Sequence, residues 1–275
     1  MTACSVIIPY YTVSEYLAVS LESLCNQTYR DFEVLLISDG APVEPESIAK
    51  PFRSRLSIIP IARPHAGAAS TRNYGISIAK SKYLAFLDSD DFWAPTKLEA
   101  QIELVEADPK LDGAYCNAHY VDENSNKLGK TQTQHLWVRK LESGKVRLNW
   151  LDHIITSSLL VKTRVVQEGG GFREDLEIAE DWAFLLEKPL ILGALQLPLL
   201  YYHRHQKSIG KVSSRGIQDK LEVVYSYKKA HPGVSNAESG VGFSRVYFDA
   251  SISLVAQRQW GGYSNGRLKV CGHLH

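Results

Sequence analysis

Short, continuous apolar runs alternate with amphipathic segments along the first 110 residues of the chain. A run that is apolar at every position is typical of a strand buried on both faces of a sheet. In the segments between these runs, apolar residues recur every three to four positions, as they do in amphipathic helices. Strand, helix and strand in alternation predict a mostly parallel sheet with right-handed crossovers. The predicted strands are residues 5–8, 32–37, 56–62 and 83–87, and the predicted helices cover residues 14–25, 45–53 and 69–76.

Polar side chains stand directly after three of these predicted strands. Tyr11 follows the first strand, Asp39 follows the second, and an acidic run at residues 88–91 follows the fourth. The carboxyl ends of parallel strands meet at one edge of a sheet, and open sheets bind their ligands there. We therefore expect these side chains to border a single crevice.

The acidic run contains three carboxylates, those of Asp88, Asp90 and Asp91. Carboxylates crowded at a strand end repel one another and raise each other's pKa unless a cation lies among them. A hard divalent ion, Mg²⁺ or Mn²⁺, prefers oxygen ligands and is usually shared with the phosphates of a bound ligand. The alternative is a solvated turn that caps the helix predicted after it. Three acids after a fully apolar strand favour the metal site.

The side chains at the predicted crevice suit a nucleotide. Tyr11 could stack on a base, Asp39 could accept a hydrogen bond from a base N–H group, and Arg72 could face the diphosphate. Each residue alone has an ordinary structural interpretation: a packing tyrosine, a turn at Asp39-Gly40, and a surface arginine on a helix. Their predicted location at one edge of the sheet favours the nucleotide site.

Composition narrows the class of protein. The 275 residues suffice for one large α/β domain, and 31 Lys and Arg against 30 Asp and Glu give a formal charge of +1, which argues against a nucleic-acid partner. The four cysteines are scattered, so neither a zinc site nor a disulfide framework is predicted, and a reducing cytoplasm is expected. No signal-peptide pattern opens the chain. The apolar segment 190–202 is too short to span a bilayer, although peripheral contact with the inner face of a membrane is compatible with the sequence.

Four spaced motifs then resemble the inverting glycosyltransferases of family 2, which have the GT-A fold. They are residues 5–11, 27–33, 67–73 and 86–91, and the resemblance covers about the first two-thirds of the chain. It implies a nucleotide-sugar donor, usually a UDP-sugar, bound with Mn²⁺ or Mg²⁺. Which of Asp90 and Asp91 is the direct metal ligand stays open, with Asp90 favoured. By resemblance, the nucleotide-sugar-binding residues are Pro9, Tyr11, Asp39, Arg72, Asp88 and Ser89, and the metal-binding residues are Asp90, Asp91 and His205.

The second half of the chain supplies the acceptor side of the predicted site. The turn cluster at 122–127, which follows a predicted strand at 114–121, opens either a mobile acceptor loop or an ordinary hairpin, and the hairpin is favoured. Residues 156–161 resemble a family strand. Glu180-Asp181 resembles the family's acidic motif at the start of a helix. By resemblance Asp181 is the general base and Glu180 a positioning or acceptor-binding residue, and the helix dipole is expected to keep Asp181 ionised. Simple helix capping is the alternative.

Together these features predict a GT-A domain at residues 1–212, with a nucleotide-binding half (about 1–110) and an acceptor half (about 111–212), and a helical C-terminal extension at 213–275. The extension contains predicted amphipathic helices at 213–230 and 241–260, which pack on the domain, mediate dimerisation or lie on a membrane; packing is favoured. The predicted activity is metal-dependent, inverting transfer of a hexosyl or N-acetylhexosaminyl group from a UDP-sugar to a saccharide or lipid-linked acceptor in surface polysaccharide or lipooligosaccharide synthesis. The alternative is a catalytically silent nucleotide-sugar-binding subunit. Oligomeric state is open.

Overall fold

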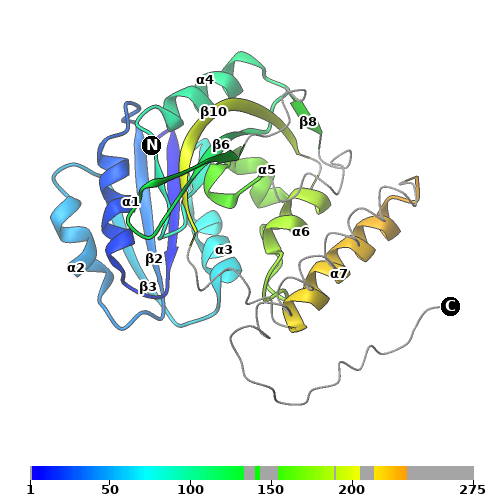
Figure 1. The fold of residues 1–275 in the computed structure, drawn as a ribbon, viewed down its shortest axis with the longest axis horizontal. Helices are drawn as coiled ribbons and strands as arrows, with labels where there is room; N and C mark the ends of the chain where they lie inside the picture. The colour runs from blue at the N-terminus through cyan, green and yellow to red at the C-terminus, as the bar shows by residue number, and fades with distance from the viewer. Residues whose placement is uncertain (1, 133–139, 143–153, 189, 205–213, 234–275) are drawn as a thin grey trace.

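The computed structural model describes residues 2–132, 140–142, 154–188, 190–204 and 214–233 (Figure 1). Its first part alternates strands and helices as the apolar pattern predicts. The strand that leads to the acidic run is one residue shorter than predicted and ends at Phe86, before Leu87. The elements are β1 (Cys4–Tyr10), α1 (Glu15–Cys25), β2 (Phe32–Asp39), α2 (Pro45–Ala49), a 3-10 turn (Lys50–Phe52), β3 (Ile58–Arg63), α3 (Ala68–Ile78) and β4 (Tyr83–Phe86).

The second part is more irregular. Residues 156–161 do not form one strand as predicted, because Thr156–Ser158 make a 3-10 turn (η3) and strand pairing begins only at Leu160. In that turn the Ser158 hydroxyl donates to the carbonyl of Ile155 over 2.6 Å. The elements are β5 (Phe92–Trp93), α4 (Lys97–Ala107), β6 (Gly113–Val121), β7 (Lys127–Gln132), β8 (Lys140–Glu142), β9 (Leu160–Lys162), α5 (Thr163–Glu168), α6 (Glu180–Glu187), β10 (Ile191–His203) and α7 (Ser214–Ala230).

Within the described residues the strands form one mixed sheet of ten, in the order β3-β2-β1-β4-β9-β6-β10-β5, with β7 paired to β6 and β8 paired to β10. The pairs β3-β2, β2-β1, β1-β4 and β6-β10 are parallel, and the others are antiparallel. The β6–β7 pair confirms the hairpin interpretation of the turn cluster at 122–127. Strand β10 continues past Pro198, which lacks an N–H donor, through shifts of register on both sides of that residue.

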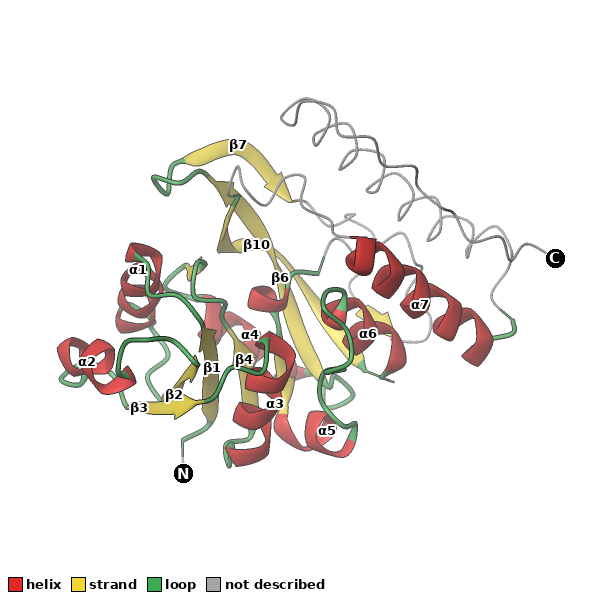
Figure 2. Ribbon diagram, turned by 90° about the horizontal axis from the view of Figure 1, so that it is seen from below, coloured by secondary structure: helices red, strands yellow, loops and turns green. Residues whose placement is uncertain are grey.

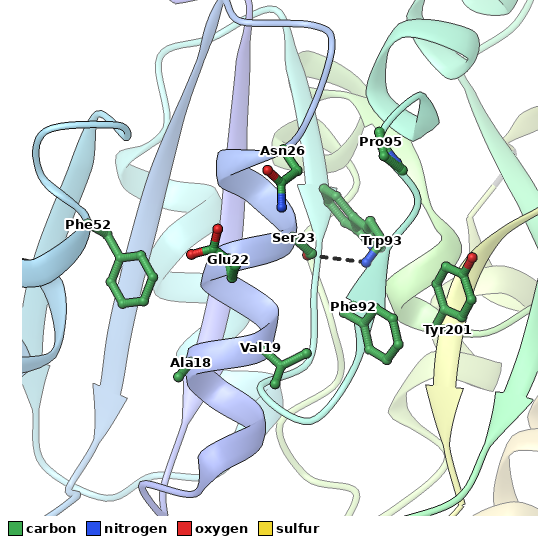
Figure 3. A pocket seen from close by; sticks show the side chains of 10 residues that line it. All are labelled: Ala18, Val19, Glu22, Ser23, Asn26, Phe52, Phe92, Trp93, Pro95 and Tyr201. Atoms are coloured by element: carbon green, nitrogen blue, oxygen red, sulfur yellow. Dashed lines mark hydrogen bonds between the residues drawn. The ribbon is translucent and has the colours of Figure 1, made fainter. Parts of the chain in front are cut away.

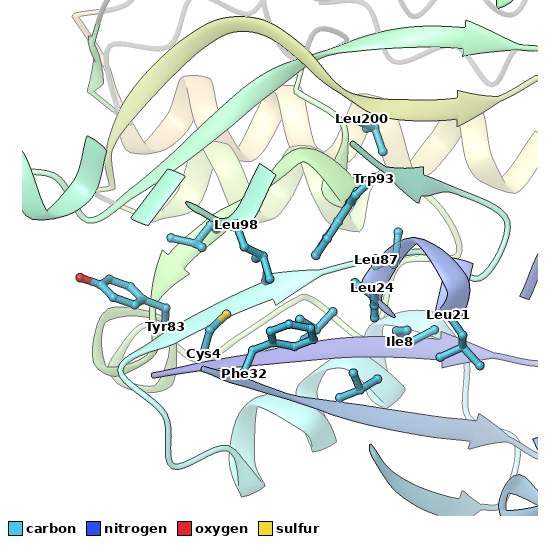
Figure 4. Packing of buried hydrophobic residues seen from close by; sticks show 14 of the residues in the cluster. Cys4, Ile8, Leu21, Leu24, Phe32, Tyr83, Leu87, Trp93, Leu98 and Leu200 are labelled. Carbon is cyan, nitrogen blue, oxygen red and sulfur yellow. The ribbon is translucent and has the colours of Figure 1, made fainter. Parts of the chain in front are cut away.

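Helices cover both faces of the sheet (Figure 2). Successive residues of β1 explain the apolar pattern: Val6 and Ile8 point to one core, shown in Figure 4, and Ile7 points to the other. Leu17 of α1 and Leu98 of α4 join the first core. Helices α3, α5, α6 and α7 contribute to the second core. Because both faces are buried, the strands fix the carboxyl edge of the sheet as a rigid platform.

Helix α7 lies where the first helix of the extension is predicted. Its residues Val223, Val224 and Tyr227 are buried in the second core, so this helix packs on the domain as the favoured alternative has it. The second predicted helix, at 241–260, lies outside the described residues. None of the helices that the structure describes has the length and apolarity needed to cross a bilayer.

Candidate active site

The acidic run forms a tight turn after β4 that is anchored at three points. The N–H of Asp91 donates to the carbonyl of Asp88 over 3.1 Å, and the N–H of Asp88 donates to the hydroxyl of Ser157 in η3 over 3.1 Å. The carboxylate of Asp91 accepts the backbone N–H of His203, at the end of β10, over 3.1 Å. Ser89 and Asp90 are partly exposed, whereas Asp91 is buried. The turn therefore holds Asp90 at the surface of the crevice.

The turn carries more negative charge than its protein partners balance. Burial raises the pKa of Asp91 well above its ordinary value, and the neighbouring charges of Asp90 and Asp88 raise it further. Oδ2 of Asp91 is buried and has no hydrogen-bond partner among the described residues. In that part of the chain no three His, Cys, Asp or Glu side chains converge on one point. The partly exposed Asp90 and the Oδ2 of Asp91, unpartnered within the described part of the chain, fit a cation held by one or two carboxylates and completed by a ligand's oxygens.

Arg72 of α3 is buried and joins the acidic turn to the start of α6. Its guanidinium donates to Asp88 over 2.6 Å and to Glu180 over 2.9 Å. Burial acts to lower the pKa of Arg72, but the charges of these two carboxylates outweigh it, and the pKa lies above its usual value. Arg72 was predicted to face a diphosphate. In this structure its guanidinium group is already paired with both carboxylates. The same contacts bring together two acidic motifs that are far apart in sequence.

Asp181 is one residue inside α6, as predicted, but its ionisation differs from the expectation. Burial raises the pKa of Asp181 to about 7, and the adjacent charge of Glu180 acts in the same direction. The carboxylate accepts the N–H of Trp182 over 2.8 Å, which lowers the pKa without offsetting burial. The N-cap residue Ala179 has φ 67°, a left-handed conformation that is strained for a residue with a Cβ atom. A base with a pKa near neutrality can both accept and release a proton.

The predicted base-binding residues lie at the carboxyl ends of β1 and β2. Tyr11 is 55% exposed, and its ring centroid lies 4.6 Å from that of His65. Asp39 is buried and accepts the N–H groups of Ala66 over 2.7 Å and Gly67 over 3.1 Å. Burial acts to raise the pKa of Asp39, but these hydrogen bonds and the charge of His65 outweigh it and leave the pKa below its usual value. Asp39 therefore fixes the loop that begins α3.

His65 is a residue that the sequence motifs did not identify. Its Nδ1 lies 2.9 Å from the carboxylate of Asp39, and its side chain is 60% exposed beside Tyr11. An Nδ1–H donated to Asp39 would leave the Nε2 edge on the exposed side of the ring. The only sequence signal was a histidine in the short connection between the third predicted strand and the following helix. Pro9, by contrast, is buried in β1 opposite Ile37.

His203 is a second residue without a predicted role. Its Nδ1 contacts the carbonyl oxygen of Asp90, and its Nε2 lies 3.0 Å from the hydroxyl of Ser125 in the β6–β7 turn. Its ring also lies 4.7 Å from that of Tyr16 in α1. His203 is buried, and through these contacts it connects the acidic turn to the hairpin. The predicted metal-binding residue His205 lies outside the described residues.

A groove of about 600 Å³ lies on the α1 side of the acidic turn (Figure 3). Its wall is formed by α1, by Phe52, by β5 and by Tyr201 of β10, and the rings of Phe92 and Tyr201 are stacked with centroids 4.5 Å apart. The Ser23 hydroxyl in this wall accepts the N–H of Trp93 over 3.2 Å. The lining is largely apolar and includes none of the predicted site residues.

Comparison with known proteins gives consistent matches. The model of the family described as glycosyl transferase family 2 matches residues 5–169. An uncharacterised glycosyltransferase of Rickettsia prowazekii is 29% identical over 184 residues, which cover 65% of this chain and 56% of that protein. The Escherichia coli UDP-Glc:alpha-D-GlcNAc-diphosphoundecaprenol beta-1,3-glucosyltransferase WfaP is 32% identical over 124 residues, covering 45% of this chain and 49% of WfaP. The chain thus spans about half the length of these relatives.

Solved structures support the fold. Residues 1–349 of Staphylococcus aureus TarS, in complex with UDP-GlcNAc, superpose with a TM-score of 0.70 at 18% identity, covering 92% of this chain and 74% of the TarS chain. The mannosyltransferase PcManGT from Pyrobaculum calidifontis, in complex with GDP-Man and Mn²⁺, superposes with a TM-score of 0.57 at 14% identity, covering 95% and 76% of the two chains. At these identities the likeness concerns the fold alone, which is the predicted GT-A-like α/β fold.

Proposed function

Because this chain belongs to glycosyltransferase family 2, we propose that it transfers a sugar from a UDP-sugar to a hydroxyl group of a saccharide or lipid-linked acceptor. The transfer is a single in-line displacement at the anomeric carbon, so the configuration of that carbon inverts. The bridge of Arg72 between Asp88 and Glu180 is the observation that carries the proposal. It brings the end of a donor-binding strand beside Asp181, a carboxylate whose pKa of about 7 suits a general base.

The donor occupies the carboxyl edge of the sheet from β2 to β4. The exposed rings of Tyr11 and His65 contact the base, and Asp39 orients His65. Asp88 and Ser89 address the ribose, and Arg72 faces the diphosphate when the donor displaces part of its present ion pairing. TarS, whose structure is described as a complex with UDP-GlcNAc, supports a uridine nucleotide. PcManGT, described with GDP-Man, makes GDP the comparison to test.

Asp90 is the proposed cation ligand, since Asp91 is buried and its carboxylate already holds the backbone of His203. When bound, Mn²⁺ or Mg²⁺ would offset the charge of the diphosphate and of the acidic turn. Asp91 then supports the cation site indirectly, because it fixes the end of β10 and the turn that presents Asp90. His205, which lies outside the described residues, remains a further candidate ligand from its resemblance to the family motif.

Asp181 accepts the proton of the acceptor hydroxyl as that oxygen attacks the sugar. The carboxylate must be ionised to do so, and its raised pKa makes the captured proton easier to hold in the transition state. Glu180 binds Arg72 over 2.9 Å and so keeps the start of α6 beside the acidic turn. Arg72 also limits the repulsion between the two acidic motifs, which would otherwise face each other across the crevice without a cation.

The acceptor is a saccharide or a lipid-linked saccharide, as the name of the similar WfaP supports. Such an acceptor would place the enzyme on the cytoplasmic side of a membrane, in contact with its surface during turnover. The products would enter a surface polysaccharide or lipooligosaccharide.

Calorimetric titration with UDP and GDP, each with and without Mn²⁺, tests the donor site. We expect UDP to bind, to bind more tightly with Mn²⁺, and to lose that metal dependence in Asp90→Ala. Asp31→Ala changes an exposed acid on the approach to β2 and serves as the matched control. Metal-dependent binding of GDP in preference to UDP would overturn the uridine assignment. UDP binding without turnover of any UDP-sugar and acceptor would instead support a silent nucleotide-sugar-binding subunit.

A further inference from the structure

Helix α7 carries a buried carboxylate that the catalytic proposal does not use. Asp219 is 1% exposed although it lies in the first part of an amphipathic surface helix. Its Oδ2 accepts the N–H of Glu177 over 2.6 Å and the N–H of Ile178 over 3.2 Å. Its Oδ1 pairs with Arg215, one turn earlier, over 2.9 Å. A carboxylate that accepts two adjacent backbone N–H groups forms strong, charge-assisted hydrogen bonds.

These two N–H groups belong to the loop that leads directly into Glu180 and Asp181. Ala179, the next residue after Ile178, has the left-handed φ of 67°. A strained conformation of this kind persists only when the surrounding structure determines it from several sides. One side is supplied by Arg72, which holds Glu180. Asp219 supplies another, because it fixes the two peptide groups that precede Ala179.

Further contacts connect α7 to the same region. The ammonium group of Lys220 lies 4.9 Å from the ring centroid of Trp182, the residue after Asp181. Val223 and Val224 are buried in the core shared with α6, and α7 lies alongside α6 (Figure 1, Figure 2). Arg173, which precedes the loop, pairs with Glu222 of α7 over 2.5 Å. The loop before Asp181 is therefore held from the α7 side as well as from α3.

We infer that Asp219 is a positioning residue for the catalytic base: it fixes the loop 177–179 and thereby sets where the carboxylate of Asp181 lies. The inference rests on the proposed role of Asp181. It also assigns α7 to the catalytic unit, beyond its role as a packed C-terminal helix. A displacement of about 1 Å in a reacting group can lower a rate by about a hundredfold. Asp219 need not touch a substrate to have a large effect on turnover.

The test compares Asp219→Ala and Asp219→Asn with Lys229→Gln, a change at an exposed residue near the end of the same helix. The probe is UDP-glucose or UDP-GlcNAc with Mn²⁺, and the readout is release of UDP with water as the acceptor. We expect Asp219→Ala to lower kcat by about tenfold to a hundredfold, with the calorimetric Kd for UDP changed less than about twofold. Asp219→Asn keeps one acceptor oxygen and should fall between Asp219→Ala and the unaltered enzyme. Lys229→Gln should leave kcat unchanged.

Hydrogen exchange provides a readout that does not depend on turnover. The peptide that contains residues 174–182 should exchange faster in Asp219→Ala than in Lys229→Gln, while peptides of β1 and β4 stay unchanged. Unaltered kcat or unaltered exchange in this peptide would overturn the inference. A parallel loss of kcat, UDP affinity and thermal stability would also overturn it, since that pattern indicates general destabilisation. If Asp219→Ala does not fold, the same criteria apply to Asp219→Asn.

One further variant separates this inference from the proposal on which it rests. If Asp181→Asn releases UDP as fast as the unaltered enzyme, Asp181 is not the base, and the positioning role falls with it. If Asp181→Asn is inactive while Asp219→Ala keeps full turnover and a protected loop, the base assignment stands and only the positioning role is overturned.

Discussion

Asp39 is buried and Asp181 is partly buried, and the pKa values of these two carboxylates shift in opposite directions. Asp39, at the end of β2, accepts two backbone N–H groups and lies beside His65, and its pKa is held below the usual value despite burial. Asp181, at the start of α6, accepts one N–H group and lies beside Glu180, and burial raises its pKa to about 7. Asp39 in the nucleotide half is therefore permanently charged, whereas Asp181 in the acceptor half can gain or lose its charge near neutral pH.

The difference follows from how each carboxylate is surrounded. A loop that offers N–H groups stabilises the ionised form, because the hydrogen bonds replace the lost water. An acidic neighbour and a single N–H group do not compensate for burial, so the neutral form remains accessible. A fixed anion suits recognition and loop anchoring, while a carboxylate that titrates near neutrality suits proton transfer. The two halves of the crevice have accordingly different tasks.

The largest expected effect comes from removing the titratable group. Asp181→Asn should lower turnover by about 10²- to 10⁴-fold, because general base catalysis typically contributes that much. The Kd for UDP should not change, since Asp181 lies on the acceptor side. Initial rates of UDP release and calorimetry measure both quantities. Glu168→Gln, which alters an exposed acid at the end of α5, is the control; retention of full turnover in Asp181→Asn would refute the contrast between the halves.

The pH profile of turnover should follow the carboxylate in the acceptor half. Below about pH 7 Asp181 is protonated and cannot accept a proton, so kcat/KM should fall about tenfold per pH unit as the pH drops. Asp39 should contribute no matching change to the affinity for UDP between pH 6 and pH 8, because it stays ionised there. A rate that is constant across that range would contradict the raised pKa of Asp181.

Stability should respond to the two carboxylates with opposite signs. Asp39 has a lowered pKa in the folded state, so its ionised form stabilises the fold above the unfolded pKa, and this stabilisation is lost as the pH falls through the folded value. Asp39→Asn should therefore lower the free energy of unfolding at pH 7 by about 1 to 3 kcal/mol, and by less near pH 3.

Asp181 has a raised pKa, so the fold is favoured while the carboxyl group is protonated and loses that advantage as the pH rises from about 4 to 7. Asp181→Asn should stabilise the protein at pH 8, by about 1 kcal/mol or more, and change little at pH 4. Urea titrations at both pH values measure these effects. Equal signs for Asp39→Asn and Asp181→Asn at pH 8 would remove the distinction between the two carboxylates.

The smallest expected effect concerns the strained residue before Glu180. Ala179→Gly should raise the free energy of unfolding by about 1 kcal/mol, because glycine adopts a positive φ without the clash of a Cβ atom. The melting temperature should rise by about 2–4 °C. Ala179→Val should have the opposite sign, since a β-branched residue is still less compatible with this conformation. A lower melting temperature for Ala179→Gly would contradict the strain.

The nucleotide half could be predicted in detail because β1, β2 and β4 are buried on both faces. A continuous apolar run such as that of β2 predicts a strand buried on both faces. The polar residue that ends each run then lies at the carboxyl edge of the sheet. The start of α6 at Glu180 was predicted from a motif resemblance. The two-residue strand β5 was not predicted, because its pairing depends on Leu200 and Tyr201 of β10, far along the chain.

Side-chain pairs between distant segments account for the remaining differences. Arg72 could be placed near the crevice from its helix, but its two carboxylate partners could not, because no local pattern encodes them. The same holds for Asp219, which reads as an ordinary acid on an amphipathic helix and bonds to a loop 42 residues away. The raised pKa of Asp181 depends on the burial that the assembled core creates, so the helix dipole alone gave the wrong direction.

The bridge made by Arg72 also has a consequence for how the chain folds. Its partner Glu180 lies 108 residues further along, so this ion pair closes a long loop. Because closing a long loop costs conformational entropy, we expect the pair to form late in folding. Until α6 docks, Arg72 has only Asp88 of these two carboxylates as a counter-ion. A nascent chain that ends before residue 180 would therefore contain most of the donor edge without Glu180 and Asp181, which are synthesised later.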